Sequence, residues 1–244
     1  MHTKTFETPS LMGEAAGNNA ALLIEAAIHD HHEANIILAT GASQFHTLDT
    51  LVNYDIIDWS KITVFHLDEY IGIDENHPAS FRLYLKQRFL EKVGKVKAFH
   101  FINGKAENPK DECERLNRLI KPLNIQVALV GIGENGHLAF NDPPADFEIE
   151  DPYIIADLDE KCRMQQVGEG WFNGLEDVPT QAISMTIKQI MKSKSIICSV
   201  PDERKAQAVK DCVLGKVSNM HPASILQKHN NCTIYLDKGS AKLI

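Results

Sequence analysis

Runs of apolar residues alternate along the chain with segments whose apolar positions recur every three or four residues. The runs predict buried strands at residues 35–40, 62–67, 98–101, 125–130, 182–185, 195–200 and 232–236. The recurring positions predict helices at residues 10–30, 43–51, 78–93, 109–120, 187–192 and 203–213. Continuous apolar strands that alternate with helices are typical of a mostly parallel sheet covered on both faces.

The alternation fails between Pro143 and Pro179, where acidic residues and the glycines Gly168, Gly170 and Gly174 interrupt it. A long irregular stretch within a compact domain is usually a lid or a binding loop. The pattern therefore predicts one α/β domain over residues 1–244, a three-layer sandwich with an inserted lid at about 143–179.

Composition and charge exclude several classes of protein. The 244 residues carry a net charge of -8 and no dense cluster of lysine or arginine, which argues against a nucleic-acid partner. No apolar run approaches the roughly 18 residues needed to cross a membrane, and the N-terminus lacks a secretory signature. We therefore expect a cytoplasmic protein without a membrane partner. The 5 cysteines show no CxxC spacing, which favours reduced thiols over disulfides or a zinc site.

Two segments that follow predicted strands are suited to an anion. Gly41, Ala42 and Ser43 form a turn into a helix, where free backbone N–H groups and the helix dipole favour phosphate. From this segment alone, an ordinary helix N-cap after a strand is the favoured interpretation. Lys205 lies in the first turn of a later helix and Arg204 precedes it, so one of the two can face an anion while the other is solvated. Taken by itself, Lys205 is better interpreted as an ordinary surface lysine.

Adjacent carboxylates, Asp68 and Glu69, follow the strand at 62–67. Neighbouring side chains on an extended segment point to opposite sides, so at most one of the two faces a cleft. A positioned Asp68 could accept a proton from one carbon of a substrate and return it to the next carbon. The alternative is a helix-capping or salt-bridged pair.

The most informative segment is 131–142, which follows the clearest buried strand and holds three glycines within six residues. Its glycines allow tight turning and close approach to a ligand. His137 can fold against Asn135 and Asp142, and a histidine oriented by a carboxylate or amide is a common general acid–base. The histidines at 29, 31 and 32 resemble a metal tract, but they end a predicted helix, where histidine suits the dipole. No metal site is therefore expected.

Three segments, 67–72, 77–81 and 131–142, together resemble the glucosamine-6-phosphate deaminase (glucosamine-6-phosphate isomerase) family over nearly the whole chain. The related 6-phosphogluconolactonases share the Gly-His pair but continue with a different segment. The resemblance implies a Rossmann-like fold of the kind found in ribose-5-phosphate isomerase and CoA transferases. It also implies conversion of an amino-sugar 6-phosphate to a ketose 6-phosphate and ammonia, with no metal or organic cofactor. The implied partner is a small-molecule sugar phosphate, and the chain is expected to be a monomer or a homo-oligomer.

The resemblance also implies roles for individual residues. His137 would assist opening of the sugar ring, oriented by Asn135 and Asp142, and Asp68 would carry the proton between C2 and C1. The phosphate would be held by Gly41, Ala42, Ser43 and Lys205.

Departures from the family pattern affect these same segments. Asn135 stands where aspartate is frequent, and Asp142 stands where glutamate is usual. The family's lid arginine is absent near Gly170, so Arg163 is expected to replace it at the phosphate. Other hexosamine phosphates, such as galactosamine 6-phosphate, remain alternative substrates. A lactone hydrolase on the same scaffold and a catalytically silent sugar-phosphate sensor remain alternative functions.

Overall fold

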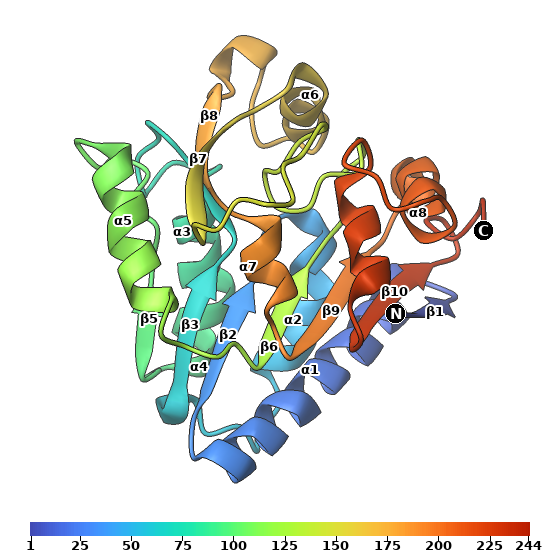
Figure 1. Cartoon of the computed structure of the whole chain (residues 1–244). Helices are drawn as coiled ribbons and strands as arrows, with labels where there is room; N and C mark the ends of the chain where they lie inside the picture. The colour runs from blue at the N-terminus through green and yellow to red at the C-terminus, as the bar shows by residue number, and fades with distance from the viewer.

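The computed structural model describes all residues from Met1 to Ile244, and its centre is a seven-stranded sheet (Figure 1). The strand order is β1-β10-β9-β6-β2-β3-β5, and every pairing in it is parallel. These strands are β1 (His2–Phe6), β10 (Cys232–Asp237), β9 (Ser195–Val200), β6 (Val127–Val130), β2 (Ala34–Leu38), β3 (Ile62–His66) and β5 (Ala98–His100). Counted from β2 in chain order, the six strands other than β1 follow the 3-2-1-4-5-6 order of the Rossmann fold. The predicted α/β sandwich with a mostly parallel sheet is confirmed.

Helices cover both faces because successive strand residues point to opposite sides. Ile36 and Leu38 of β2 belong to one core cluster and Ile37 to the other. The first cluster includes side chains of α1 (Pro9–His31), α2 (Phe45–Val52) and the helical segment α3 (Phe81–Leu85), η3 (Lys86–Leu90) and α4 (Glu91–Val93). The second includes side chains of α5 (Pro109–Ile120), α7 (Ile187–Met191), α8 (Ala206–Val213) and the 3-10 segment η6 (Pro222–Lys228). The result is a three-layer sandwich with two cores.

A second sheet, which the sequence pattern did not predict, lies beyond one end of the first (Figure 1). Its strands β4 (Asp68–Tyr70), β8 (Gln181–Met185) and β7 (Tyr153–Asp157) pair antiparallel. The predicted strand at 182–185 exists, but it belongs to this sheet and not to the parallel one. The prediction that residues 143–179 are irregular is wrong, because this segment contains β7, α6 (Glu160–Gly168) and the 3-10 turn η4 (Leu175–Asp177).

Two other boundaries differ from the pattern for local reasons. The helix expected at 78–93 begins at Phe81, because the Ser80 side chain accepts from the backbone N–H of Leu83 as an N-cap. Strand β1 was missed because its side chains are polar and largely exposed, as suits an edge strand paired only with β10. No helix is long and apolar enough to cross a membrane.

Candidate active site

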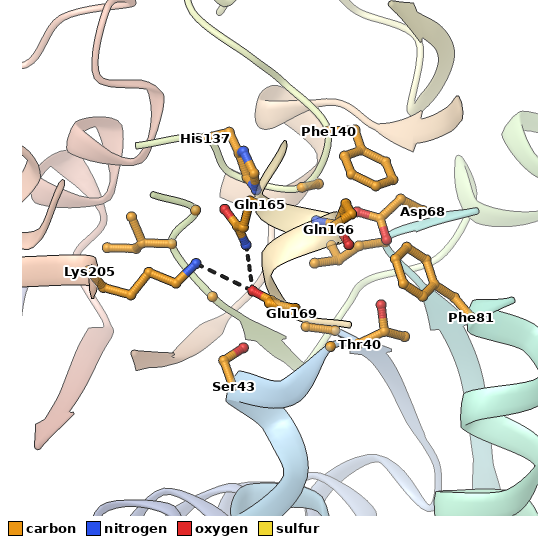
Figure 2. A pocket seen from close by; sticks show the side chains of 17 residues that line it. Thr40, Ser43, Asp68, Phe81, His137, Phe140, Gln165, Gln166, Glu169 and Lys205 are labelled. Carbon is orange, nitrogen blue, oxygen red and sulfur yellow. Dashed lines mark hydrogen bonds and ion pairs between the residues drawn. The ribbon is translucent and has the colours of Figure 1, made fainter. Parts of the chain in front are cut away.

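A cavity opens at the carboxyl ends of β2, β3 and β6, where the strand order reverses between β2 and β6 (Figure 2). Open α/β sheets bind their ligands at this switch point. About 560 Å³ of space in the cavity, including its open mouth, is not filled by protein atoms. The lining residues are Ala39, Thr40, Gly41, Ser43, Leu67, Asp68, Phe81, Gly131, Ile132, Gly133, His137, Ala139, Phe140, Gln165, Gln166, Glu169 and Lys205.

Asp68 enters the cavity from the start of β4, and its side chain is buried without a hydrogen-bond donor among the protein's groups. Burial, reinforced by the charge of Glu69, raises the pKa of Asp68 to about 8. A carboxylate with such a pKa binds a proton far more strongly than an exposed one. It is therefore suited to taking a proton from carbon and holding it for return.

The neighbouring Glu69 points away from the cavity, as the alternation of an extended segment requires. Its carboxylate accepts hydrogen bonds from the backbone N–H groups of Tyr70, Phe81 and Arg82 and from the Ser80 hydroxyl. The Arg82 guanidinium lies 3.6 Å away. Burial raises the pKa of Glu69 although these hydrogen bonds oppose the shift. Glu69 therefore ties β4 to the start of α3 and fixes the position from which Asp68 enters the cavity.

The loop after β6 brings His137, Asn135 and Asp142 together. The Asn135 side chain accepts from the His137 backbone N–H at 3.1 Å and donates to Asp142 Oδ1 at 2.9 Å. That same Oδ1 lies 3.2 Å from His137 Nδ1. Burial opposes ionisation of Asp142, but its contacts with His137 and Asn135 outweigh burial and hold its pKa below the usual value. The negatively charged Asp142 carboxylate therefore lies beside Nδ1 of His137, and the imidazole ring itself lines the cavity.

Glycine is required beneath the imidazole. A Cβ at Gly133 would lie 2.3 Å from His137 ring atoms, so any larger residue would displace the ring. Gly131, Gly133 and Gly136 also match the G-x-G-x-x-G spacing of dinucleotide-binding turns. No helix begins after them, however, and the loop instead forms turns that place His137.

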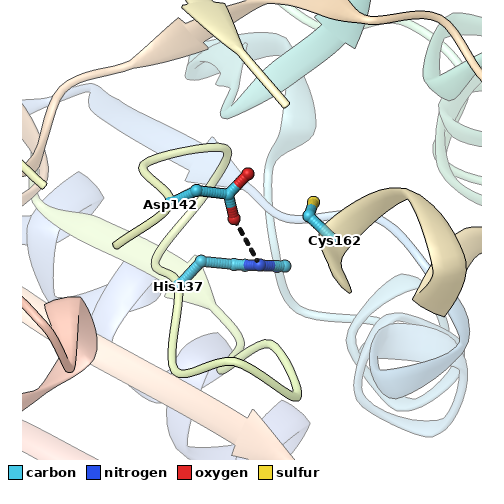
Figure 3. A group of neighbouring side chains, drawn as sticks. All are labelled: His137, Asp142 and Cys162. Atoms are coloured by element: carbon cyan, nitrogen blue, oxygen red, sulfur yellow. Dashed lines mark ion pairs between the residues drawn. The ribbon is translucent and has the colours of Figure 1, made fainter. Parts of the chain in front are cut away.

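Cys162 of α6 completes a buried group with His137 and Asp142 (Figure 3). One potential metal-ligand atom from each of the three lies within 4.8 Å of the other two. Burial and the adjacent Asp142 raise the pKa of the Cys162 thiol far above its usual value, so it is a neutral neighbour of the pair. This is the one histidine, cysteine and carboxylate group that could hold a metal, and the histidines at 29, 31 and 32 form no such cluster.

Gly41, Ser43 and Lys205 line the cavity, and we call these three residues the anion cradle. Figure 2 shows the side chains of Ser43 and Lys205. Gly41 adopts a φ of 88°, which glycine tolerates readily, and starts the turn that carries Ser43 into α2. Lys205 is buried, which lowers its pKa, while Arg204 is half-exposed and pairs with Asp202 and Glu134. Of the neighbouring pair, only Lys205 therefore faces the cavity. Ala42 is exposed and does not line it.

Arg163 does not reach the cavity, contrary to the expectation that it replaces the lid arginine. Its guanidinium donates to the backbone carbonyls of Leu175 and Val178, at 2.6 and 2.9 Å. Arg163 lies within α6, and its side chain is used to close the segment that follows this helix. The residues that α6 and its end do contribute to the cavity are Gln165, Gln166 and Glu169.

Sequence reasoning missed Gln166 and Glu169. The available signal for this helix was Asp159, an acidic N-cap whose side chain accepts a hydrogen bond from the Cys162 backbone N–H. The two glutamines, Gln165 and Gln166, follow within the same helix. That signal predicts a helix but does not indicate which of its faces covers the cavity.

Comparisons with known proteins agree with this arrangement. The family model described as glucosamine-6-phosphate isomerases/6-phosphogluconolactonase matches residues 7–235. A glucosamine-6-phosphate deaminase from Clostridium acetobutylicum is 36% identical over 230 residues, covering 92% of this chain and 94% of that protein. A second, from Lacticaseibacillus paracasei, is 38% identical over 209 residues, covering 84% of each chain.

Solved structures extend the comparison to the fold. A monomeric glucosamine-6-phosphate deaminase superposes with a TM-score of 0.90 at 28% identity, covering 100% of both chains. A 6-phosphogluconolactonase from Trypanosoma brucei reaches a TM-score of 0.80 at 16% identity, covering 99% of this chain and 97% of that one. At that identity the second likeness concerns the fold alone.

Proposed function

The chain belongs to the glucosamine-6-phosphate isomerase/6-phosphogluconolactonase family, and from this we propose that it converts glucosamine 6-phosphate and water to fructose 6-phosphate and ammonia. One observation carries the proposal: Asp68, His137 and the anion cradle line the same cavity. A lactonase needs a group that activates water but has no use for a carboxylate that moves a proton between carbons.

His137 acts first, on the closed sugar ring. Opening a pyranose requires a proton to leave the anomeric hydroxyl and another to reach the ring oxygen. The imidazole lines the cavity, and the Asp142 carboxylate lies 3.2 Å from Nδ1, where it orients the ring. Asn135 fixes that carboxylate and the histidine backbone together, so the ring enters the reaction already oriented.

Asp68 acts on the open chain. Its carboxylate removes the proton from C2 of the amino-aldehyde while the aldehyde oxygen takes up a proton from solvent, which leaves an enolamine, and it then returns the C2 proton to C1. The resulting C2 imine adds water and expels ammonia, leaving the ketose. The raised pKa of Asp68, about 8, supports this role because a carboxylate of ordinary pKa is a weaker base and would remove the C2 proton less readily. This chemistry uses side chains of the protein and no cofactor.

We propose that Gly41, Ser43 and Lys205 bind the phosphate, with Ala42 contributing through its backbone only. The resulting picture is one catalytic unit over residues 1–244 in which the segment 143–179 covers the cavity. The enzyme acts on a small-molecule sugar phosphate in the cytoplasm, as a monomer or a homo-oligomer, in the breakdown of amino sugars.

Ammonia release from a panel of hexosamine 6-phosphates, with the ketose phosphate assayed in parallel, tests the proposal. We expect equal amounts of ammonia and fructose 6-phosphate from glucosamine 6-phosphate. Turnover of galactosamine 6-phosphate alone would change the substrate but not the reaction. Hydrolysis of 6-phosphogluconolactone without any ammonia release would overturn the proposal.

Asp68→Asn separates the two reactions, with Asp74→Asn as a control at an exposed aspartate outside the cavity. We expect Asp68→Asn to lower deamination at least 1,000-fold, roughly the upper part of what a positioned acid–base supplies. The control should retain wild-type turnover. A deaminase that tolerates Asp68→Asn would remove this residue from the mechanism.

A further inference from the structure

A carboxylate occupies the anion cradle. Glu169 ends α6, and Figure 2 shows its side chain between Lys205 and Ser43. Its Oε1 lies 3.8 Å from Lys205 Nζ, and the Glu169 side chain is only 9% exposed. An acidic group is unexpected here, because a site that binds phosphate should repel it.

Two further contacts hold Glu169 in place. Gln165 donates from Nε2 to Oε1 at 2.8 Å, and Trp171 donates from its indole nitrogen to Oε2 at 3.2 Å. The carboxylate is therefore bonded to the covering segment on one side and paired with the cradle on the other. Glu169 therefore connects the covering segment to Lys205 of the cradle across the cavity.

Charge indicates that this arrangement belongs to the site without substrate. Lys205 is buried, and Glu169 is the anion paired with it. A phosphate bound by Lys205 and Ser43 would lie against the Glu169 carboxylate, which is largely shielded from water, and there like charges repel strongly. The two anions cannot share the cradle.

We propose that Glu169 is a phosphate surrogate: it holds the covering segment against Lys205 while the cavity is empty, and the phosphate of the substrate displaces it. This inference rests on the proposed function for the identity of the displacing group. A neutral sugar end offers Lys205 no charge in exchange for Glu169. Glu169 thereby determines specificity in two ways. It excludes amino sugars that lack the phosphate, and it sets the affinity for amino sugars that carry the phosphate, which must displace it.

Glu169→Gln tests the proposal, since glutamine keeps the size and the oxygen that accepts from Trp171 but loses the charge. We expect the KM for glucosamine 6-phosphate to fall about 3- to 30-fold, the equivalent of one partly buried ion pair, with a smaller change in kcat. Inorganic phosphate should become a stronger competitive inhibitor by the same factor. Glu160→Gln, at an exposed position of the same helix, should change neither value.

Direct binding of inorganic phosphate provides a readout that needs no turnover. Displacement of Glu169 breaks its bond to Trp171, so phosphate should change the tryptophan fluorescence of the wild type and leave that of Trp171→Phe unchanged. The Kd for phosphate should fall about 3- to 30-fold in Glu169→Gln.

The outcomes separate this inference from the proposed function. Tighter phosphate binding in Glu169→Gln without turnover of any hexosamine phosphate would support the surrogate role and overturn the deaminase. Deamination with an unchanged Kd for phosphate would overturn the surrogate role alone. A KM that rises several-fold in Glu169→Gln would also overturn it, because the carboxylate would then be a substrate contact.

Discussion

Replacing Asp68 by asparagine is expected to lower deamination at least about 1,000-fold and, at neutral pH, to stabilise the folded chain. The carboxylate is buried in the folded state, where its pKa is about 8, whereas its ordinary value is 3.8. Between these values the folded state binds a proton that the unfolded state has released. Stability therefore falls as the pH rises from about 4 towards 8, and the loss is complete above the folded-state pKa.

The size of this effect follows from the two pKa values. Each tenfold difference in proton affinity is worth about 1.4 kcal/mol, so the wild type loses at most roughly 5 kcal/mol at pH 7.5. Asparagine never ionises and avoids this loss, but its amide donors lack partners in the cavity wall, which costs about 1 to 3 kcal/mol. We expect a net stabilisation of at most about 2 to 4 kcal/mol at pH 7.5, which corresponds to an increase in Tm of roughly 4 to 16 °C for a chain of this size.

Thermal unfolding of the wild type and Asp68→Asn at pH 7.5 and 4.5 measures the effect. At pH 4.5 the folded wild type is protonated at Asp68, so the advantage of the variant should disappear. Asp74→Asn should give no stabilisation at either pH, because the Asn76 backbone N–H, followed by weaker contacts, holds the pKa of Asp74 below its ordinary value. A variant less stable than the wild type at pH 7.5, or equally stabilised at both pH values, would refute the reasoning.

Three further predictions concern the same site. Gly133→Ala should displace the His137 ring, because the added Cβ would lie 2.3 Å from ring atoms. We expect kcat to fall at least tenfold and Tm to stay unchanged, and a fully active variant would contradict this geometry. Arg163→Ala should raise KM no more than about threefold but speed hydrogen exchange in residues 160–178, because the guanidinium bonds two backbone carbonyls there; a large KM effect would restore it to the phosphate site. The kcat/KM should rise as the pH increases towards about 8, the pKa of Asp68 in the free enzyme, and a flat profile from pH 6 to 8 would show that Asp68 is already ionised.

The sequence by itself determined the parallel core and most of the chemistry. Strands such as β2 and β6 are buried on both faces, so their residues form continuous apolar runs that can be recognised without partners. His137, Asn135 and Asp142 are close in sequence on one glycine-rich loop, and Asp68 follows a strand end. Because open parallel sheets bind ligands beyond the carboxyl ends of their strands, these positions were enough to predict that the residues meet at one edge of the sheet.

The second sheet and the covering segment could not be predicted in the same way. Strand β7 is five residues long and half-exposed, and its partner β8 lies more than 20 residues further along the chain. Its apolar residues acquire a strand identity only through that distant pairing. The sequence likewise offered Arg163 as a phosphate ligand because of its charge, whereas helix α6 turns it towards backbone carbonyls.

Only the tertiary structure decided which charged groups share the cavity. Asp68 and Glu69 are chemically alike and adjacent, yet one faces the cavity and the other caps α3, because neighbours on an extended segment diverge. Glu169 and Lys205 are 36 positions apart, and they meet because α6 folds over the end of the parallel sheet. The sequence determined which groups were available for proton transfer and anion binding. Long-range packing set their distances and their burial, on which pKa values and ion pairing depend.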